Sequence, residues 1–149
     1  MAIDQTEKQQ ILDWLAASRG DMLDLLERLV NIDSWSYDKA GVDKVGEAIA
    51  EFLEGHGIDV TRIPVETHGD SFRASVGAAA GNRPIMLLGH RDTVFPTGEV
   101  AKRPFRIEGD RAYGPGVADM KAGLVLNAFV IAAFKKFGGA PAPLIALFT

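Results

Sequence analysis

Hydrophobic residues recur at every third or fourth position along the first third of the chain. In residues 6–32 this helical spacing is broken near Ser18, which predicts two amphipathic helices, with Ser18 as the N-cap residue of the second. The same spacing returns in residues 42–57, after a polar loop, and predicts a third helix that ends at Gly55 or Gly57. The N-terminal part of the chain is therefore predicted to be helical.

The pattern changes after residue 57, where short apolar and β-branched runs alternate with turn residues. The unbroken apolar run 85–90 is typical of a strand covered on both faces. Residues 120–139 are apolar nearly all round, which predicts a helix buried on more than one side. This order of strands and helices predicts an α/β fold with three layers. Further strands are expected at 58–65, 71–79 and 142–149, with a hairpin at 105–114 that turns at Gly109-Asp110 and a glycine-rich loop at 114–119.

Composition narrows the classes of function. The 149 residues suffice for one domain with a core, and a net charge of −4 gives no broad basic surface for nucleic acid. The chain has no cysteine, so a metal would have to be bound by histidine and carboxylates. The polar N-terminus lacks the apolar core of a signal peptide, and no run is expected to reach the length of a membrane span. We therefore expect a cytoplasmic protein without a membrane partner, although a processed secreted protein would have the same composition.

The stretch MLLGHRDTVFP, residues 86–96, places an imidazole and a carboxylate two residues apart where a buried strand ends. Ligand sites in open α/β sheets form beyond the carboxyl ends of strands. His90 can present a neutral ring nitrogen to zinc, and Asp92 can accept a hydrogen bond from the other ring nitrogen. The alternative is a turn histidine hydrogen-bonded to a nearby aspartate. Arg91 points either at solvent or at substrate.

The second candidate is Asp119, in the stretch YGPGVADMKAG, where a glycine-rich loop leads into a helix. Aspartate is a favoured N-cap residue, so one interpretation is helix capping. The other is a carboxylate that bridges two metal ions. The loop lacks the spacing of a P-loop and of the dinucleotide fingerprint, which disfavours a nucleotide-binding α/β domain.

The two motifs together resemble those of the M20 family of zinc metallopeptidases. GHRDTVFPTG is followed, after a short interval, by PFRIEGDRAYGPGVADMKAG, and the similarity is closest to the glutamate carboxypeptidase-like branch. The N-terminal helices, the helix-to-strand passage VGEAIAEFLEGHGIDV and the last strand LIALFT follow the family order, so the resemblance covers nearly all of the chain. It implies a three-layer α/β/α zinc-exopeptidase-like catalytic domain that is incomplete, with residues 1–149 as its N-terminal part.

The resemblance also implies roles for the three polar residues. His90 would be a ligand of one zinc, Asp92 the active-site aspartate that orients it, and Asp119 the bridge between two zinc ions. Cobalt or manganese can occupy similar ligands. The implied reaction is hydrolysis of an amide bond in a small peptide or an N-acyl amino acid, of the carboxypeptidase or deacylase type, with the metals activating water and a glutamate as general base.

The family pattern places this glutamate, in a pair of adjacent glutamates, directly after a strand like LIALFT. That position would follow Thr149, as would the remaining catalytic half and the dimerisation domain, so we expect the 149-residue chain alone to be inactive. The second hypothesis is a non-enzymatic α/β module derived from the family. It would form homo-oligomers or bind a partner through an exposed sheet edge.

The other titratable and aromatic residues have structural interpretations. His56 lies near a predicted helix end, where a C-cap role explains it. Glu66, His68 and Asp70 alternate in a predicted turn, for which a solvated turn is the better explanation than metal binding. The aromatic residues expected to serve in packing are Trp14, Trp35, Phe129, Phe134 and Phe137.

Overall fold

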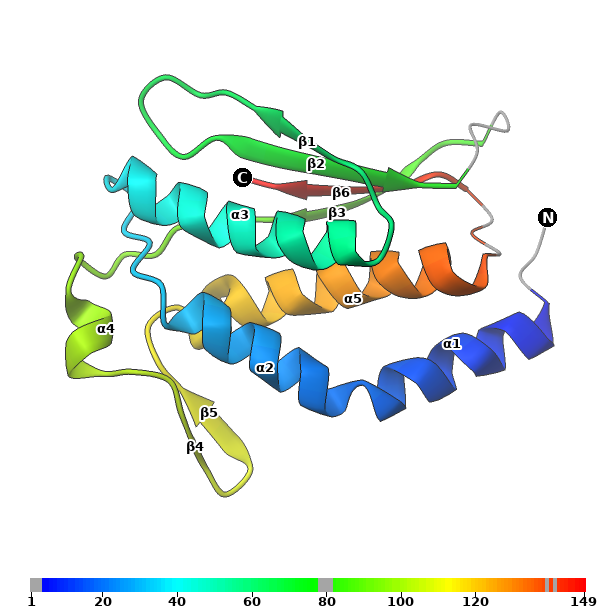
Figure 1. The fold of residues 1–149 in the computed structure, drawn as a ribbon, viewed down its shortest axis with the longest axis horizontal. Helices are drawn as coiled ribbons and strands as arrows, with labels where there is room; N and C mark the ends of the chain where they lie inside the picture. The colour runs from blue at the N-terminus through cyan, green and yellow to red at the C-terminus, as the bar shows by residue number, and fades with distance from the viewer. Residues whose placement is uncertain (1–3, 78–81, 139, 141) are drawn as a thin grey trace.

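A mixed sheet and a set of helices make up the chain, and a smaller hairpin lies at one end (Figure 1). The structure, a computed structural model, describes residues 4–77, 82–138, 140 and 142–149. The helices are α1 (Gln5–Ala17), α2 (Arg19–Val30), α3 (Lys39–Gly55), α4 (Glu99–Lys102) and α5 (Ala122–Phe137), with a π-helical turn, η1 (Val117–Lys121), directly before α5. The strands are β1 (Val60–Ile63), β2 (Ser71–Val76), β3 (Ile85–Gly89), β4 (Arg106–Glu108), β5 (Arg111–Tyr113) and β6 (Leu144–Phe148).

The helices of the N-terminal part follow the predicted pattern, with two local differences. Ser18 lies at the N-cap position of α2, as predicted, but its hydroxyl donates to the Trp14 carbonyl of the preceding helix at 2.8 Å and makes no cap bond. The third helix begins earlier than predicted, because Asp38 accepts a hydrogen bond from the Gly41 amide at 3.1 Å and caps it. Its predicted end at Gly55 is confirmed.

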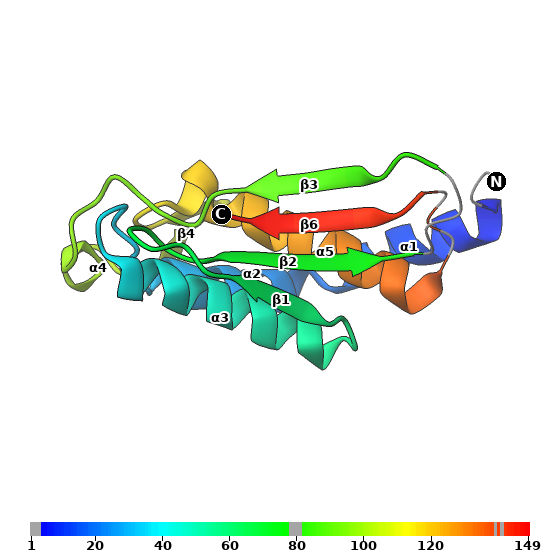
Figure 2. The same ribbon diagram turned by 90° about the horizontal axis from the view of Figure 1, so that it is seen from above.

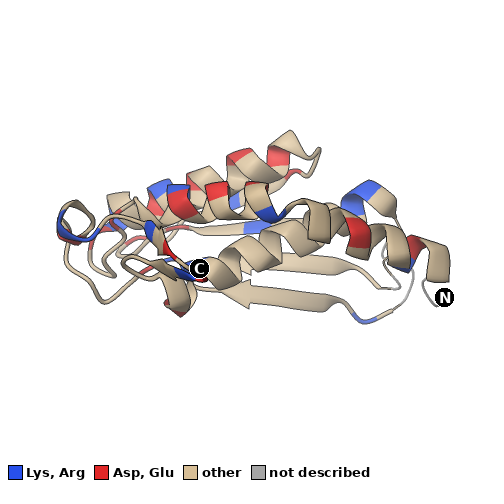
Figure 3. Ribbon diagram, turned by 90° about the horizontal axis from the view of Figure 1, so that it is seen from below, with Lys and Arg blue, Asp and Glu red and all other residues tan. Residues whose placement is uncertain are grey.

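The main sheet has the strand order β1-β2-β6-β3. Strands β3 and β6 are parallel and the other pairs antiparallel, so the predicted α/β class is confirmed as a mixed sheet. Helices α1, α2, α3 and α5 lie on one side of this sheet, which Figures 2 and 3 show from opposite directions. The charged residues are spread over helices and loops, and the strands in view in Figure 3 are almost free of them. The three-layer domain was predicted to be incomplete, and the described residues supply its sheet and the helical layer on one face.

The prediction that the strand at 85–90 is covered on both faces is wrong for this chain. Met86 and Leu88 are 55% and 58% exposed. They lie on the same face as Ile145 and Leu147, their partners in the parallel ladder with β6. The apolar run is therefore suited to burial, but β3 is an edge strand of the main sheet and the helices pack against its other face.

Helix α5 packs in the core, as its apolar composition predicts. It contacts α1, α2 and α3 on one side and β2, β3 and β6 on the other. By length and composition Val117–Phe137 also qualifies as a membrane span, so the expectation that no run reaches that length is wrong. The burial of this helix in the core explains its apolar character. The helix ends at Gly138 with a positive φ of 73°, while Gly139 lies outside the described residues. The fully buried side chains of this core include Leu124 and Ile131 of α5 itself, together with Leu29, Val45, Ile49, Leu53 and Phe148.

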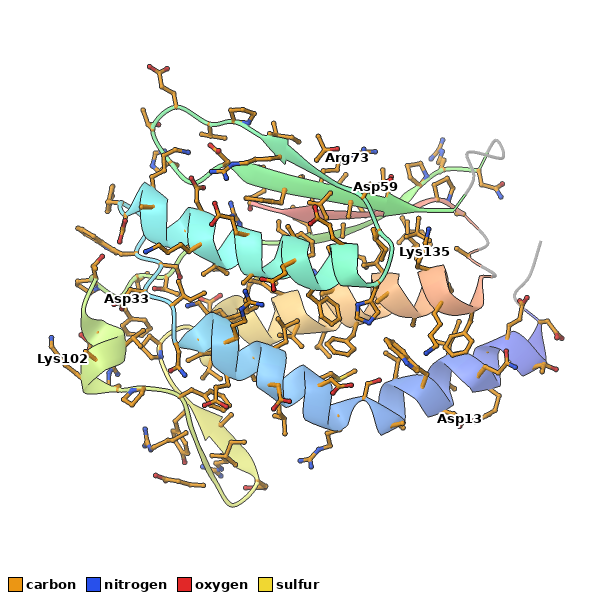
Figure 4. The ribbon with its side chains drawn as sticks, in the orientation of Figure 1. Asp13, Asp33, Asp59, Arg73, Lys102 and Lys135 are labelled. Atoms are coloured by element: carbon orange, nitrogen blue, oxygen red, sulfur yellow. The ribbon has the colours of Figure 1, made fainter. Side chains whose placement is uncertain are left out.

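The predicted hairpin is confirmed as β4 and β5, with Glu108 opposite Arg111 and a left-handed Gly109 (φ 62°) at the turn. Helix α4 lies beside it and is held to the end of α2 by Asp33 (Figure 4). The Asp33 carboxylate accepts the amides of Gly98 at 2.8 Å and Val100 at 3.1 Å, which satisfies free donors of the first turn. These segments form the end of the molecule at which the carboxyl ends of β3 and β6 meet.

Candidate metal centre

The candidate site begins where the parallel strands β3 and β6 end side by side. The Gly89 carbonyl accepts the Thr149 amide at 2.9 Å, and the Thr149 carbonyl accepts the Arg91 amide at 2.8 Å. A side chain at Gly89 would collide with Leu124 of α5, so glycine lets the strand approach the helix closely. His90 therefore follows directly from the buried end of the strand and faces the pocket beyond it.

The imidazole of His90 lies between two carboxylates. Its Nδ1 is 3.0 Å from the Asp92 carbonyl oxygen and 3.1 Å from Asp92 Oδ1. Both are acceptors for an Nδ1–H donor, and in the tautomer that carries this proton Nε2 can present a lone pair. Nε2 points at Asp119, 3.0 Å from its Oδ1. Burial lowers the pKa of His90, but the hydrogen bonds and negative charges of Asp119 and Asp92 outweigh it, so the net pKa is raised above the ordinary value.

Asp119 reaches His90 from a turn and does not cap α5. It lies in η1 with non-helical φ and ψ of −128° and 92°, and α5 begins three residues later without a side-chain cap bond. Its side chain is 87% exposed. The glycines before it, Gly114 and Gly116, have positive φ, a conformation that lets the loop pass close to Val30 and Thr93. The capping interpretation is thus contradicted.

A cavity of about 270 Å³ opens over the His90–Asp119 pair. It is lined by both residues and by Asp92, together with residues 93–95, 114 and 116–118. A ring nitrogen and a carboxylate oxygen that converge on an open cavity are a donor set that suits zinc. Among the described residues, however, no cluster of three or more histidine, cysteine, aspartate or glutamate side chains is placed to hold a metal ion. These residues fit a metal as part of its ligand set.

The loop before α3 holds the segment that carries the candidate residues. Ser36 donates to Asp92 Oδ2 at 2.5 Å, on the side of the carboxylate away from His90. Ser34 donates to the Arg91 carbonyl at 2.9 Å, and Trp35 and Thr93 form a parallel β-bridge. Ser36 was not predicted from the sequence, because its contact with Asp92 joins residues 56 apart in the chain and no motif surrounds Ser36.

Two buried cations near the site were also missed. Arg91 is fully buried, so it points neither at solvent nor at substrate, and burial lowers its pKa to about 10. Lys121, two residues after Asp119, is 1% exposed; it donates to the Ile32 carbonyl at 2.7 Å, and burial lowers its pKa to about 8. The sequence gives little indication that Arg91 and Lys121 are buried, because charged residues in and beside loops are usually exposed.

The remaining histidines lie away from this cavity. His56 is the C-cap residue of α3, where its Nδ1 lies 2.8 Å from the Phe52 carbonyl oxygen, as expected. His68 is exposed in its turn. The solvated-turn interpretation is wrong for Asp70, which is 6% exposed and forms ion pairs with Lys39 and with Arg62. The Lys39 ammonium, the Val65 amide and the Arg62 guanidinium hold the pKa of Asp70 well below its usual range.

The predicted packing roles of the aromatic residues agree with the structure. Phe129 is buried in the core, and its ring lies 4.7 Å from that of Phe52 and 5.9 Å from that of Trp14. Trp35 packs edge-on against Tyr37, and Phe134 and Phe137 are half-buried on α5.

Comparison with known proteins identifies the family. Residues 86–149, which carry both candidate motifs, match the family described as peptidase family M20/M25/M40. The chain belongs to this family. It is 36% identical to carboxypeptidase G2 of Pseudomonas sp. (strain RS-16) over 115 residues, which are 76% of this chain and 28% of that protein. It is 35% identical to succinyl-diaminopimelate desuccinylase of Gluconobacter oxydans (strain 621H), over 62% of this chain and 25% of the relative.

Solved structures show the same fold. The chain superposes on the dipeptidase Dug1p of Saccharomyces cerevisiae with a TM-score of 0.74 at 18% identity, covering 94% of this chain and 34% of the other. For human carnosine dipeptidase 1 the TM-score is 0.78 at 14% identity, with the same coverage. An M20 metallo-carboxypeptidase of Sulfolobus solfataricus gives 0.70 at 20% identity, over 85% and 30% of the two chains. The chain thus spans about a quarter to a third of the length of these proteins, and family membership implies a divalent metal.

Proposed function

We propose that residues 1–149 are the N-terminal part of an M20 catalytic domain and supply the first metal ligands of a hydrolase that cleaves amide bonds in small peptides or N-acyl amino acids. The observation that carries this proposal is the approach of His90 Nε2 to Asp119 Oδ1 at 3.0 Å with Asp92 behind the imidazole. The names of the relatives, a carboxypeptidase and a desuccinylase, support an amide substrate at an acyl or peptide terminus.

Each of the three residues has a distinct part in this proposal. His90 would hold one zinc ion through Nε2, and Asp119 would bridge two zinc ions. Asp92 would accept a hydrogen bond from Nδ1–H of His90, which would leave the nitrogen facing the cavity free for a metal. Zinc bound there would polarise the scissile carbonyl and make water a stronger nucleophile. Cobalt or manganese would suit the same nitrogen and oxygen donors.

A complete centre needs more than the described residues bring together. They contribute two ligands and an orienting carboxylate, whereas a catalytic zinc has three protein ligands as a rule. The general base is also missing from this set, and the family resemblance places it after Thr149. Loss of general-base catalysis typically removes about 10²–10⁴-fold of rate, so we expect the 149-residue chain alone to show no hydrolysis of acyl amino acids.

Zinc titration of the 149-residue chain by calorimetry tests the proposal. We expect binding that is weakened at least about tenfold in both His90→Ala and Asp119→Ala, because each removes one ligand. His68→Ala, which removes an exposed histidine outside the cavity, is the matched control and should bind as the wild type does. Zinc binding that is equal in all four proteins would refute the metal centre.

The exposed edge of the sheet favours a second candidate function, that of a module that pairs with a second copy or another chain. Strand β3 is an edge strand with Met86 and Leu88 exposed, and such an edge is a template for pairing. Sedimentation measures this directly. A concentration-independent monomer would exclude self-association, whereas a dimer that Leu88→Lys dissociates would support it.

A further inference from the structure

The guanidinium of Arg91 is the most deeply buried charge beside the candidate centre. Arg91 has no exposed surface, and its side chain donates hydrogen bonds to three main-chain carbonyls. Nη1 donates to Val42 of α3 at 3.0 Å, Nε donates to Thr149 at 3.3 Å, and Nη2 donates to Asp70. Its Cζ atom lies over the Phe72 ring, 4.8 Å from the ring centre. One side chain thus joins a helix, the loop before β2 and the end of β6.

Helix α3 leaves space for the guanidinium because it has a glycine, Gly46, beside this group. Gly46 lies inside α3, where glycine costs about 1 kcal/mol of helix stability relative to alanine. A Cβ at that position would overlap Arg91 Nη1 and the Phe72 ring. The helix therefore carries an unfavourable residue at a position where a larger side chain would displace the guanidinium.

Because Arg91 lies between His90 and Asp92 in the chain, its burial affects the direction in which these two side chains point. In an extended segment, residues i and i+2 point to one side and residue i+1 to the other. His90 and Asp92 both face the cavity, and Arg91 faces the protein interior. A side chain fixed at three points sets the rotation of this segment about its own axis, and with it the direction of both neighbours.

We propose that Arg91 is a positioning residue of the metal centre, whose three main-chain hydrogen bonds hold His90 and Asp92 in register with each other and with the end of β6. This inference rests on the proposed metal centre for its function, but the alignment of His90 with Asp92 can be measured without metal. The signature of that alignment is the hydrogen bond that an Nδ1–H group of His90 can donate to Asp92, whose carbonyl oxygen and Oδ1 lie 3.0 Å and 3.1 Å from Nδ1.

The experiment compares the wild-type 149-residue chain with Arg91→Met, which keeps the length of the side chain and removes its donors. Histidine ring ¹⁵N–¹H spectra without metal, at a pH of about 9 where imidazole is neutral, report the tautomer. The chain has three histidines, so His90→Gln assigns the His90 signal. The matched control is Arg73→Met, on the exposed face of β2 (Figure 4). Zinc affinity by calorimetry is the second measurement.

We expect His90 to show the Nδ1–H tautomer in the wild type and in Arg73→Met, and to lose it in Arg91→Met, with zinc binding weakened by about 10–100-fold. The inference is overturned if Arg91→Met keeps both the tautomer and the zinc affinity of the wild type and differs only in its unfolding midpoint. If Arg91→Met does not fold, Arg91→Lys, which keeps the charge but lacks the planar fork, takes its place in both measurements. A wild type with no zinc affinity would refute the metal centre, and the tautomer would still decide the role of Arg91.

Discussion

Replacement of Gly46 by alanine should destabilise the protein, although alanine is the better helix former. Gly46 lies in the interior of α3, and its backbone is compatible with any residue. An added Cβ would overlap Arg91 Nη1 and stand 2.6 Å from Cδ2 of Phe72. Both neighbours are fully or nearly fully buried, so neither can move away into solvent.

The magnitude follows from two opposing contributions. Alanine gains about 1 kcal/mol over glycine inside a helix. Overpacking a filled core costs about 1–3 kcal/mol. Displacement of the guanidinium from the Val42 carbonyl, to which Nη1 donates at 3.0 Å, leaves a buried N–H donor of Arg91 unpaired at a cost of about 1–3 kcal/mol. The net expectation is a loss of about 1–5 kcal/mol in the free energy of unfolding, the range left when the helix gain is subtracted from both costs.

Urea unfolding of the wild type, Gly46→Ala and Gly20→Ala tests this reasoning. Gly20 is also helical, in α2, but a Cβ there would meet no atom within 4 Å. Gly20→Ala should therefore raise the free energy of unfolding by up to about 1 kcal/mol, with an unchanged dependence on urea. Equal stabilisation by both substitutions would refute the tight contact between α3 and Arg91.

Three further predictions follow from contacts of the core and the site. Ser36→Ala removes the donor to Asp92 and should weaken zinc binding by about tenfold in calorimetry, with a Ser75→Ala variant on the exposed side of β2 unaffected. The pKa of Asp70 is lowered in the folded state, so its ion pairs stabilise the protein fully above pH about 4 and less as the pH falls below that value. Urea unfolding at pH 6 and pH 3 should therefore show a smaller decrease in the free energy of unfolding at pH 3 for Asp70→Asn than for the wild type. Phe129→Ala should cost about 3–5 kcal/mol in the same assay, whereas Leu126→Ala on the exposed side of α5 should change stability by less than about 0.5 kcal/mol.

The sequence could predict those residues of the site whose placement depends on neighbouring residues in the chain. His90 and Asp92 stand two apart after a strand, so one segment places both on the same side of the chain. Asp119 was found through the family resemblance, because by sequence alone an aspartate before a helix predicts a cap as readily as a ligand. Ser36 and the destination of Arg91 depend on segments 21 to 58 residues away, and no local pattern encodes such contacts.

The fold shows the same division between local pattern and long-range packing. Helical periodicity correctly predicts α1, α2 and α3, since each helix has one face that must be buried. The apolar run of β3 led to a wrong prediction of burial on both faces, because composition indicates which surfaces are suited to burial and not which neighbours cover them. Asp70 was misjudged for the opposite reason: its turn looks solvated, but cations from α3 and β1 enclose its carboxylate.

The buried cations bear on how the candidate centre is held in place. Arg91 follows His90 directly and Lys121 follows Asp119 by two residues, and each donates to main-chain carbonyls of elements outside the cavity. The His90 segment is thereby tied to α3 and the Asp119 turn to the end of α2, both of which pack on α5 in the core. The loops that carry the ligands are therefore fixed from behind by the helical layer, which can set the distance between His90 and Asp119 before any metal binds. Metal affinity should consequently respond to substitutions such as Gly46→Ala, which lie in the helical layer and do not line the cavity.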